Sequence, residues 1–167
     1  MNNSEDSVIV LAEDDPGHAR LIEKSLRATT AGPLIRFENG KDALDYLRSG
    51  EQVSLLLLDL NMPVMDGYQV LRRLRADPRT MRIPVIVLTT TDDPIQRCYD
   101  LGCTACVVKS ADCSQLNETM RRLGLLPART TPPNGLRLES PEEARAIRAS
   151  CVSNPRWAPA GQWPAAL

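Results

Sequence analysis

The chain has 167 residues and a formal net charge of −1, so it suits one domain with some additional sequence and creates no overall field toward nucleic acid or anionic lipid. Hydrophobic residues make up 43% of the chain, which is enough for a packed core and excludes disorder throughout. No apolar run could span a bilayer, and the polar, acidic start MNNSEDS lacks the features of a signal peptide. We therefore expect a cytoplasmic protein that binds neither membrane nor nucleic acid.

Strand-like and helix-like segments alternate along the first 123 residues. Residues 8–11 form a β-branched apolar run, and Pro16 then begins a helical pattern with an apolar face. The alternation continues with strands predicted at residues 34–37, 54–58, 84–88 and 105–108, and with helices predicted at residues 41–48, 66–75, 94–101 and from Asp112 or Ser114 onward. Such alternation predicts an α/β fold with a doubly wound, five-stranded parallel sheet, for which we choose the order 2-1-3-4-5.

The stretch LLLLDLNMPVMDG contains the most apolar of these strands, and it ends on Asp59. A strand that is apolar on both faces is typical of a parallel sheet covered by helices on both sides. A carboxylate directly after such a strand is therefore carried to the carboxyl-terminal edge of the sheet. In sheets of this kind, function is found at that edge, where the strand order reverses.

Other polar side chains follow the remaining strands, and we expect them to meet Asp59. Glu13 and Asp14 follow the first strand, Thr89 ends the fourth and Lys109 follows the fifth. Carboxylates held close together repel unless a cation joins them, and hard oxygen ligands suit Mg²⁺. A lysine suits a phosphoryl oxygen, and a carboxylate can accept a phosphoryl group covalently. These residues predict a magnesium-assisted phosphoryl-transfer site with Asp59 as the nucleophile.

Residues 8 to about 123 resemble a response-regulator receiver domain of two-component signalling. The resemblance lies in LAEDDP, LLLLDLNMPVMDG, PVIVLTT and VVK, which agree in order, spacing and strand placement. The stretches EDDPGHARLIEKSL and IPVIVLTTTDDP are also similar to the small stand-alone receivers that serve phytochrome-type histidine kinases. The resemblance implies a protein that accepts a phosphoryl group from a histidine kinase and signals by a change of conformation or dimer state.

The resemblance also implies a role for each site residue. Asp59 matches the phosphoacceptor, Thr89 the switch hydroxyl and Lys109 the phosphate-binding lysine. For the Mg²⁺ site, Asp14 matches the direct ligand, Glu13 its acidic neighbour, and Asn61 the residue whose backbone carbonyl completes the coordination. Outside the site, we expect Asp15 to cap the helix that Pro16 begins, Asp66 to cap the next helix, and Gly67 to permit a tight backbone.

Two residues depart from the family pattern. Ser110 follows Lys109 where the family usually has a cis proline, and a cis bond without proline costs about 2.5–4 kcal/mol, so we predict a trans bond. Cys106 stands where many receivers carry an aromatic switch residue. Because cysteine is too small to report the motion of Thr89 by its rotamer, we expect signalling to rely on loop ordering after Thr89 or on the dimer state.

The sequence disfavours three other interpretations. An aspartyl-phosphate phosphatase is the alternative function, but such enzymes carry a second aspartate where this chain has Asn61, so we expect no enzyme activity on external substrates. A DNA-binding regulator is disfavoured because the tail shows no helix-turn-helix pattern. Cys103 and Cys106 form a C-x-x-C, but five clustered cysteines with one histidine favour reduced structural thiols over a metal or redox pair.

The composition changes after Leu123. The last 44 residues hold seven of the 13 prolines and both tryptophans, and Ser140-Pro141-Glu142-Glu143 predicts the start of one short helix. We therefore divide the chain into a receiver domain, residues 1–124, and a proline-rich helical and irregular extension, residues 125–167. Two tryptophans in a chain with only six aromatic residues suggest that part of the extension is buried, either on the same subunit or on a second one. We expect the extension to act as the arm of a homodimer.

Overall fold

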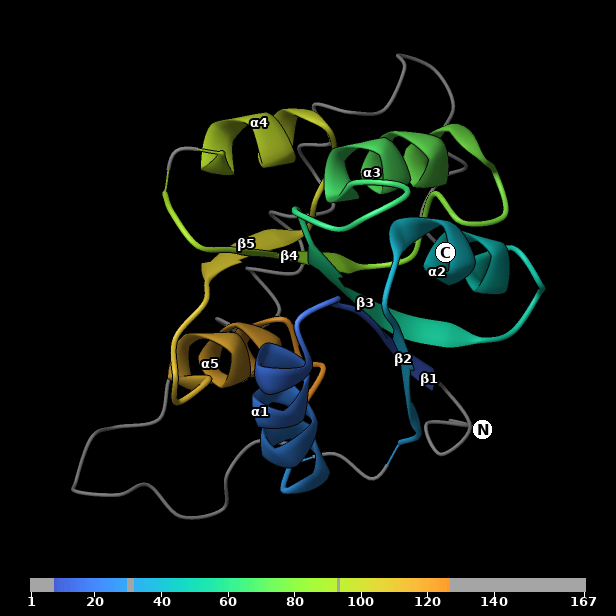
Figure 1. Cartoon of the computed structure of the whole chain (residues 1–167). Coiled ribbons are helices and arrows are strands. Elements are labelled where there is room, and N and C mark those ends of the chain that lie inside the picture. Colours follow the sequence, from blue (N-terminus) through green and yellow to red (C-terminus); the bar gives the residue numbers. More distant parts are fainter. Residues whose placement is uncertain (1–7, 30–31, 93, 127–167) are drawn as a thin grey trace.

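The computed structural model describes residues 8–29, 32–92 and 94–126. Within them lie five strands, β1 (Val8–Ala12), β2 (Leu34–Phe37), β3 (Val53–Asp59), β4 (Val85–Thr89) and β5 (Ala105–Val108), and five helices, α1 (Pro16–Arg27), α2 (Gly40–Leu47), α3 (Gly67–Ala76), α4 (Ile95–Asp100) and α5 (Ser114–Arg122). The strands pair in parallel in the order β2-β1-β3-β4-β5. Helices α1 and α5 cover one face of the sheet, and α2, α3 and α4 cover the other (Figure 1). The predicted fold and strand order are confirmed.

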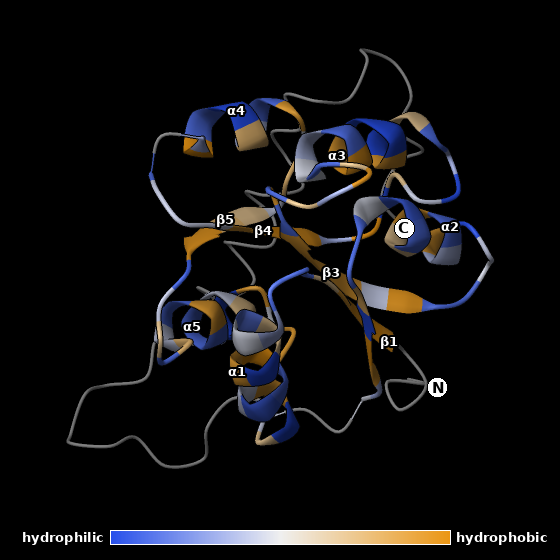
Figure 2. Cartoon of the chain, viewed as in Figure 1, coloured by the Kyte–Doolittle hydropathy of each residue, from blue (hydrophilic) through white to orange (hydrophobic). Residues whose placement is uncertain are grey.

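The two faces of the sheet carry separate apolar cores because successive side chains of a strand point to opposite sides. In β3, Leu56 and Leu58 pack toward α2, α3 and α4, whereas Leu55 and Leu57 pack toward α1 and α5. All four are essentially inaccessible to solvent. Figure 2 shows the apolar strands lying between helices whose outward surfaces are hydrophilic. The unbroken run of leucines is thus explained by a strand with no solvent-facing side.

Side-chain caps fix the first residues of α1 and α3, the helices that follow β1 and β3. The Asp15 carboxylate accepts a hydrogen bond from the amide of His18 at 2.7 Å, and the Asp66 carboxylate accepts one from the amide of Gln69 at 2.8 Å. Both are side-chain caps of the kind that satisfies free amides in the first turn of a helix. The caps predicted at Asp15 and Asp66 are confirmed, so α1 and α3 begin at defined points beside the strand ends.

The turn into α5 contains Ser110, which stands where the receiver family usually has a proline. The described residues contain no cis peptide bond, so the trans Lys109–Ser110 bond is confirmed. The Asp112 carboxylate accepts hydrogen bonds from the Ser110 hydroxyl at 2.9 Å and from the Ser114 amide at 3.1 Å. Cys113 adopts a left-handed backbone, with φ of 53°, immediately before α5 begins at Ser114. Polar side chains therefore shape this turn in place of the usual proline.

Packing against the α1 and α5 side continues through Leu125 and Leu126, two residues beyond the boundary expected at residue 124. The helix predicted from Ser140 and the dimerisation arm fall in residues 127–167, outside the described residues.

In the parts of the chain that the structure describes, no helix is both long and apolar enough to cross a membrane.

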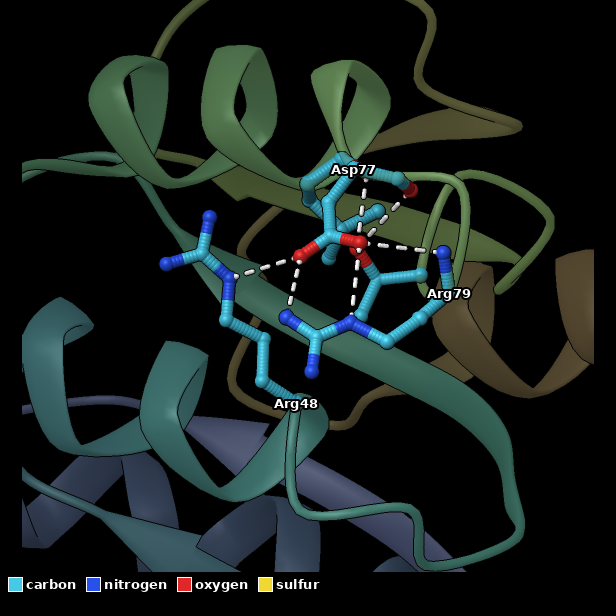
Figure 3. Close-up of polar contacts among 5 residues, drawn as sticks. Arg48, Asp77 and Arg79 are labelled. Atoms are coloured by element: carbon cyan, nitrogen blue, oxygen red, sulfur yellow. Dashed lines mark hydrogen bonds and ion pairs between the residues drawn. The ribbon is translucent and has the colours of Figure 1, made fainter.

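A second charged cluster lies on the side of the sheet where the strands begin. Figure 3 shows the Asp77 carboxylate between the guanidinium groups of Arg48 and Arg79. Asp77 Oδ2 lies 3.1 Å from Arg48 Nε and 2.9 Å from Arg79 Nη2, and Asp77 Oδ1 accepts a hydrogen bond from Arg79 Nε at 3.2 Å. Hydrogen bonds from the side chain and amide of Arg79 lower the pKa of Asp77 to about 2. We call these three residues the arginine–aspartate cluster; they join the ends of α2 and α3.

Candidate functional site

The carboxyl-terminal ends of β1, β3 and β5 bring together four of the residues singled out in the sequence. One carboxylate oxygen from each of Glu13, Asp14 and Asp59 lies within 4.8 Å of the other two. The Lys109 ammonium lies 2.7 Å from Glu13 Oε2 and 2.8 Å from Asp59 Oδ1. We call these four residues the acidic site. Their predicted convergence is confirmed.

Burial makes the charges of the acidic site costly. Glu13 is fully buried and Asp59 is 3% exposed, whereas Asp14 is exposed. Burial raises the pKa of both Glu13 and Asp59, and the hydrogen bond from Lys109 offsets this only in part. Burial alone would lower the pKa of Lys109, but its bonds to Asp59 and Glu13 outweigh that effect and raise the pKa. The ammonium is therefore held charged between two carboxylates that it does not fully neutralise.

Asp59 is held in place by the packing of α3 against the end of β3. The amide of Gly67 donates to the Leu60 carbonyl at 2.9 Å. A Cβ atom on Gly67 would collide with the Asp59 carbonyl oxygen and would lie 2.8 Å from Leu60 Cα. Only glycine permits this approach, which confirms the tight backbone expected at Gly67. The main chain that carries the proposed phosphoacceptor is thus fixed by direct contact with the next helix.

Residues 13–15 form the loop after β1, which we call the acidic loop. Contacts from the neighbouring strand β2 hold this loop in place. The Glu13 amide donates to the Phe37 carbonyl at 3.0 Å, which extends the pairing of β1 with β2 by one step. The Arg36 guanidinium then donates from Nε to the Glu13 carbonyl at 3.2 Å and from Nη2 to the Asp14 carbonyl at 3.3 Å. Sequence reasoning missed Arg36. The signal was present, since Arg36 is the only charged residue in the apolar strand LIRF.

The donors of the acidic site fit a hard divalent cation. Three carboxylates lie close together, and the two buried ones, Glu13 and Asp59, share the single ammonium of Lys109. Oxygen donors of this kind and charge suit Mg²⁺. Glu13, Asp14 and Asp59 would hold the ion. Asn61, whose carbonyl was expected to contribute, lies exposed in the loop two residues after Asp59.

Thr89 is the last residue of β4, and Lys109 directly follows the neighbouring strand β5. The Lys109 amide donates a hydrogen bond to the Thr89 carbonyl at 2.7 Å. The Thr89 side chain is buried, and its hydroxyl donates to the Thr91 carbonyl at 2.9 Å and accepts from the Thr91 amide at 3.2 Å. The hydroxyl is therefore engaged within its own loop. To reach a group on Asp59, it must exchange its bond to the Thr91 carbonyl.

Cys106 lies in β5 beside the core under α4, as its position in the sequence predicted. Burial raises the pKa of the Cys106 thiol to about 12 and also raises the pKa of Cys103. All four cysteines in the described residues are free, whereas Cys151 lies outside them. Neutral thiols are poor nucleophiles and poor metal ligands, so the C-x-x-C pair has the character of structural thiols.

The family model for the response regulator receiver domain matches residues 9–121, and the chain belongs to this family. Among curated relatives, the probable methanogenesis regulatory protein FilR2 of Methanothrix harundinacea is 35% identical over 124 residues, covering 70% of this chain and 80% of FilR2. The response regulator Rcp1 of Synechocystis is 36% identical over 118 residues, covering 65% of this chain and 80% of Rcp1.

Solved structures of receivers superpose on the same part of the chain. The phosphorylated cyanobacterial phytochrome response regulator RcpA is 35% identical, with a TM-score of 0.64, and the match covers 73% of this chain and 99% of RcpA. The bacteriophytochrome response regulator AtBRR is 31% identical, with a TM-score of 0.65, covering 77% and 99%. A Mn²⁺-bound form of Rcp1 is 31% identical, with a TM-score of 0.63, and the match covers 76% of this chain and 99% of Rcp1.

Proposed function

We propose that the chain is a phosphoacceptor switch in which Asp59 takes a phosphoryl group from the phosphohistidine of a partner histidine kinase in a Mg²⁺-dependent reaction. The observation that carries the proposal is the acidic site itself. A buried aspartate at a strand end shares one ammonium with a second buried carboxylate, and a third carboxylate lies close by. Membership of the receiver family supports the same assignment.

In the proposed transfer, a carboxylate oxygen of Asp59 attacks phosphorus, the P–O bond forms and the P–N bond to the kinase histidine breaks. Lys109 already lies 2.8 Å from Asp59 Oδ1, so its ammonium is in position to bind a phosphoryl oxygen. Mg²⁺, when bound by Glu13, Asp14 and Asp59, would neutralise charge on the phosphoryl oxygens. The remaining work of the protein is positioning and charge stabilisation, as is usual for phosphoryl transfer.

Phosphorylation then acts as a local electrostatic switch. The acyl phosphate adds negative charge and acceptor oxygens beside Lys109 and Thr89. We propose that the Thr89 hydroxyl leaves the Thr91 carbonyl and donates to a phosphoryl oxygen, which reorders the loop that follows β4. Because this loop leads into α4, the face around α4 and β5 would report phosphorylation without an aromatic residue at position 106.

We further propose a phytochrome-type histidine kinase as the partner, because RcpA and AtBRR are described as phytochrome and bacteriophytochrome response regulators. The chain would act in the cytoplasm, where it meets the kinase domain. Its role would be that of a phosphoacceptor with at most its own dephosphorylation, rather than an enzyme acting on external substrates. No described feature favours the phosphatase alternative.

The proposed homodimer rests on the proline-rich residues 125–167. We propose that this extension packs on a second copy of the chain, and that phosphorylation changes the dimer equilibrium. Truncation after Leu126, the last described residue, keeps the packed core and removes the arm. Mass in solution should then fall to that of a monomer, whereas an unchanged oligomer would show that the arm is not responsible.

Phosphoryl transfer tests the central proposal. The chain would be mixed with Mg²⁺ and with autophosphorylated histidine kinases, phytochrome-type kinases included, and acid-labile, base-labile phosphate would be followed on the chain. Asp59→Asn should abolish incorporation, while Asp66→Asn, which changes only a helix cap, serves as the matched control. Incorporation that survives in Asp59→Asn, or that needs no divalent cation, would contradict the proposal.

A further inference from the structure

Arg36 occupies an unusual position for a charged residue. It lies in β2 between Ile35 and Phe37, in register with the fully buried Leu11 of β1. Its side chain is only 21% exposed. Burying most of an arginine side chain takes its polar end partly out of water, so hydrogen bonds must compensate for the lost hydration. Those bonds go to the main chain of the acidic loop rather than to a carboxylate of the acidic site.

The two carbonyls that Arg36 binds lie just beyond the point where strand pairing stops. The last backbone bond between β1 and β2 runs from the Glu13 amide to the Phe37 carbonyl, and β2 ends at Phe37. Past this point, β2 no longer supplies amides to which the carbonyls of Glu13 and Asp14 could bond. The guanidinium presents several N–H donors in a fixed planar fork, so Nε and Nη2 can bind two successive carbonyls at once.

These bonds matter for the acidic site because they hold the backbone that carries two of its carboxylates. Glu13 and Asp14 point into a space shared with Asp59, where like charges repel. Fixing both carbonyls restricts the backbone rotation by which the loop could relieve this repulsion. The Asp15 amide, which donates to Glu13 Oε1 at 3.2 Å, further ties the Glu13 side chain to the same loop.

The surface contact of Arg36 does not explain its placement. Arg36 Nη2 lies 3.6 Å from Glu38 Oε1, and the Glu38 side chain is 75% exposed. Exposed ion pairs of this length contribute little to stability. The better sheltered contact is the partly buried bond from Nε to the Glu13 carbonyl, which the exposed bond from Nη2 to the Asp14 carbonyl extends along the same loop.

We propose that Arg36 is a positioning residue for the divalent-cation site, which it preorganises by clamping the main chain of Glu13 and Asp14. This proposal rests on the proposed function, because it assumes that the acidic site binds Mg²⁺ during phosphoryl transfer. Arg36 touches neither the phosphoacceptor carboxylate nor the transferred group. Its effect falls on cation affinity and not on the chemical step at saturating cation.

The test measures Mg²⁺ binding to the full chain by isothermal titration calorimetry, with no phosphodonor present. Arg36→Met keeps the apolar stem but removes both donors, and it should weaken Mg²⁺ affinity about tenfold, the size of effect seen when residues that support metal ligands are changed. With acetyl phosphate as donor, the Mg²⁺ concentration giving half-maximal phosphorylation should rise by the same factor. The rate at saturating Mg²⁺ should change less than about twofold if the effect is on binding alone.

Glu38→Gln is the matched control, since it removes the surface ion pair and leaves the bonds to the carbonyls; its Mg²⁺ affinity should equal that of the wild type. A folded Arg36→Met variant with wild-type affinity would overturn the proposal. If Arg36→Met does not fold, Arg36→Lys decides the matter, because an ammonium lacks the planar fork that spans both carbonyls. Arg36→Lys should bind Mg²⁺ at least about twofold more weakly, and wild-type affinity in this variant would also overturn the proposal.

The outcomes separate this proposal from the proposed function. A wild-type chain that binds no Mg²⁺ and takes up no phosphoryl group contradicts both. A wild-type chain that does both, with an Arg36→Met variant that binds Mg²⁺ equally well, contradicts only the role of Arg36.

Discussion

The acidic site lies at the carboxyl-terminal ends of the strands, and the arginine–aspartate cluster lies on the opposite side, where the strands begin. Their charge balances are reversed. At the acidic site, three carboxylates lie close together, two of them share the ammonium of Lys109, and the pKa values of Glu13 and Asp59 are raised by burial. In the arginine–aspartate cluster, the single carboxylate of Asp77 is shared by two guanidinium groups, and its pKa is lowered to about 2.

This difference in charge balance distinguishes a candidate binding site, the acidic site, from a structural contact, the arginine–aspartate cluster. The Asp77 carboxylate is more stable as an anion in the folded chain than in the unfolded chain, so its charge stabilises the fold. The buried carboxylates of the acidic site are less stable as anions in the folded chain, so their charge opposes folding until a cation or a phosphoryl group changes the balance. The surplus of buried negative charge therefore indicates the acidic site as the candidate functional site.

The largest expected effect comes from Asp59→Asn. Phosphorylation should fall more than about 100-fold, because an amide cannot take up the phosphoryl group. The free energy of unfolding should not fall, since the substitution removes a buried charge whose pKa is raised. Urea denaturation at neutral pH without Mg²⁺ measures this, and a clear loss of stability would show that the Asp59 charge supports the fold.

The pH dependence of the same variant sharpens the contrast. Because the pKa of folded Asp59 lies above its ordinary value of 3.8, the folded wild type binds more protons than the unfolded chain, and its stability falls as pH rises from about 4 through the folded pKa. Asp59→Asn should flatten this decline. An unchanged pH profile would contradict a raised pKa at Asp59.

Lys109→Met should have the next largest effect. It leaves two buried carboxylates without their cation, and breaking a buried pair in this way costs about 3 kcal/mol of unfolding free energy. Added Mg²⁺ should recover part of the loss, because a divalent ion can neutralise the same carboxylates. Lys41→Met is the control, since Lys41 and Asp45 form an exposed pair; a loss of equal size there would argue against a special role for burial.

Val64 offers a smaller change at the same edge of the sheet. This β-branched residue is 78% exposed and has a φ of 68°, a left-handed conformation that is strained for valine. Val64→Asn should raise the free energy of unfolding by about 1 kcal/mol, because asparagine tolerates this conformation. Val64→Ile keeps the β-branch and should bring no gain, so equal stabilisation by both variants would exclude backbone strain as the cause.

The smallest expected effect is that of Asp77→Asn in the arginine–aspartate cluster. The variant should be less stable than the wild type at neutral pH, and its phosphorylation should be unaffected. The lowered pKa of Asp77 contributes stability that is present above about pH 4 and is lost as pH falls through about 2. The difference between variant and wild type should therefore shrink between pH 4 and pH 2, and a constant difference would point to lost packing instead of lost charge.

Much of the fold could be predicted because its signals are local. The leucine run of β3 shows a strand buried on both sides, and Asp15 and Asp66 show where two helices begin. The convergence of Glu13, Asp59 and Lys109 followed from one topological rule, that carboxyl ends of parallel strands share an edge. The contacts of Arg36 could not be predicted in this way, because they join a β2 side chain to main-chain atoms more than 20 residues earlier.

By itself, then, the sequence determined the strand order, the family and the identity of the phosphoacceptor candidate, since periodicity, caps and motif spacing are all encoded over short distances. The tertiary structure alone decided how the charges are shared. It paired Lys109 with Glu13 as well as with Asp59, kept the Thr89 hydroxyl on the Thr91 carbonyl, and placed Arg36 against the acidic loop. Partners and burial depend on which strands become neighbours, and burial sets the cost of each charge.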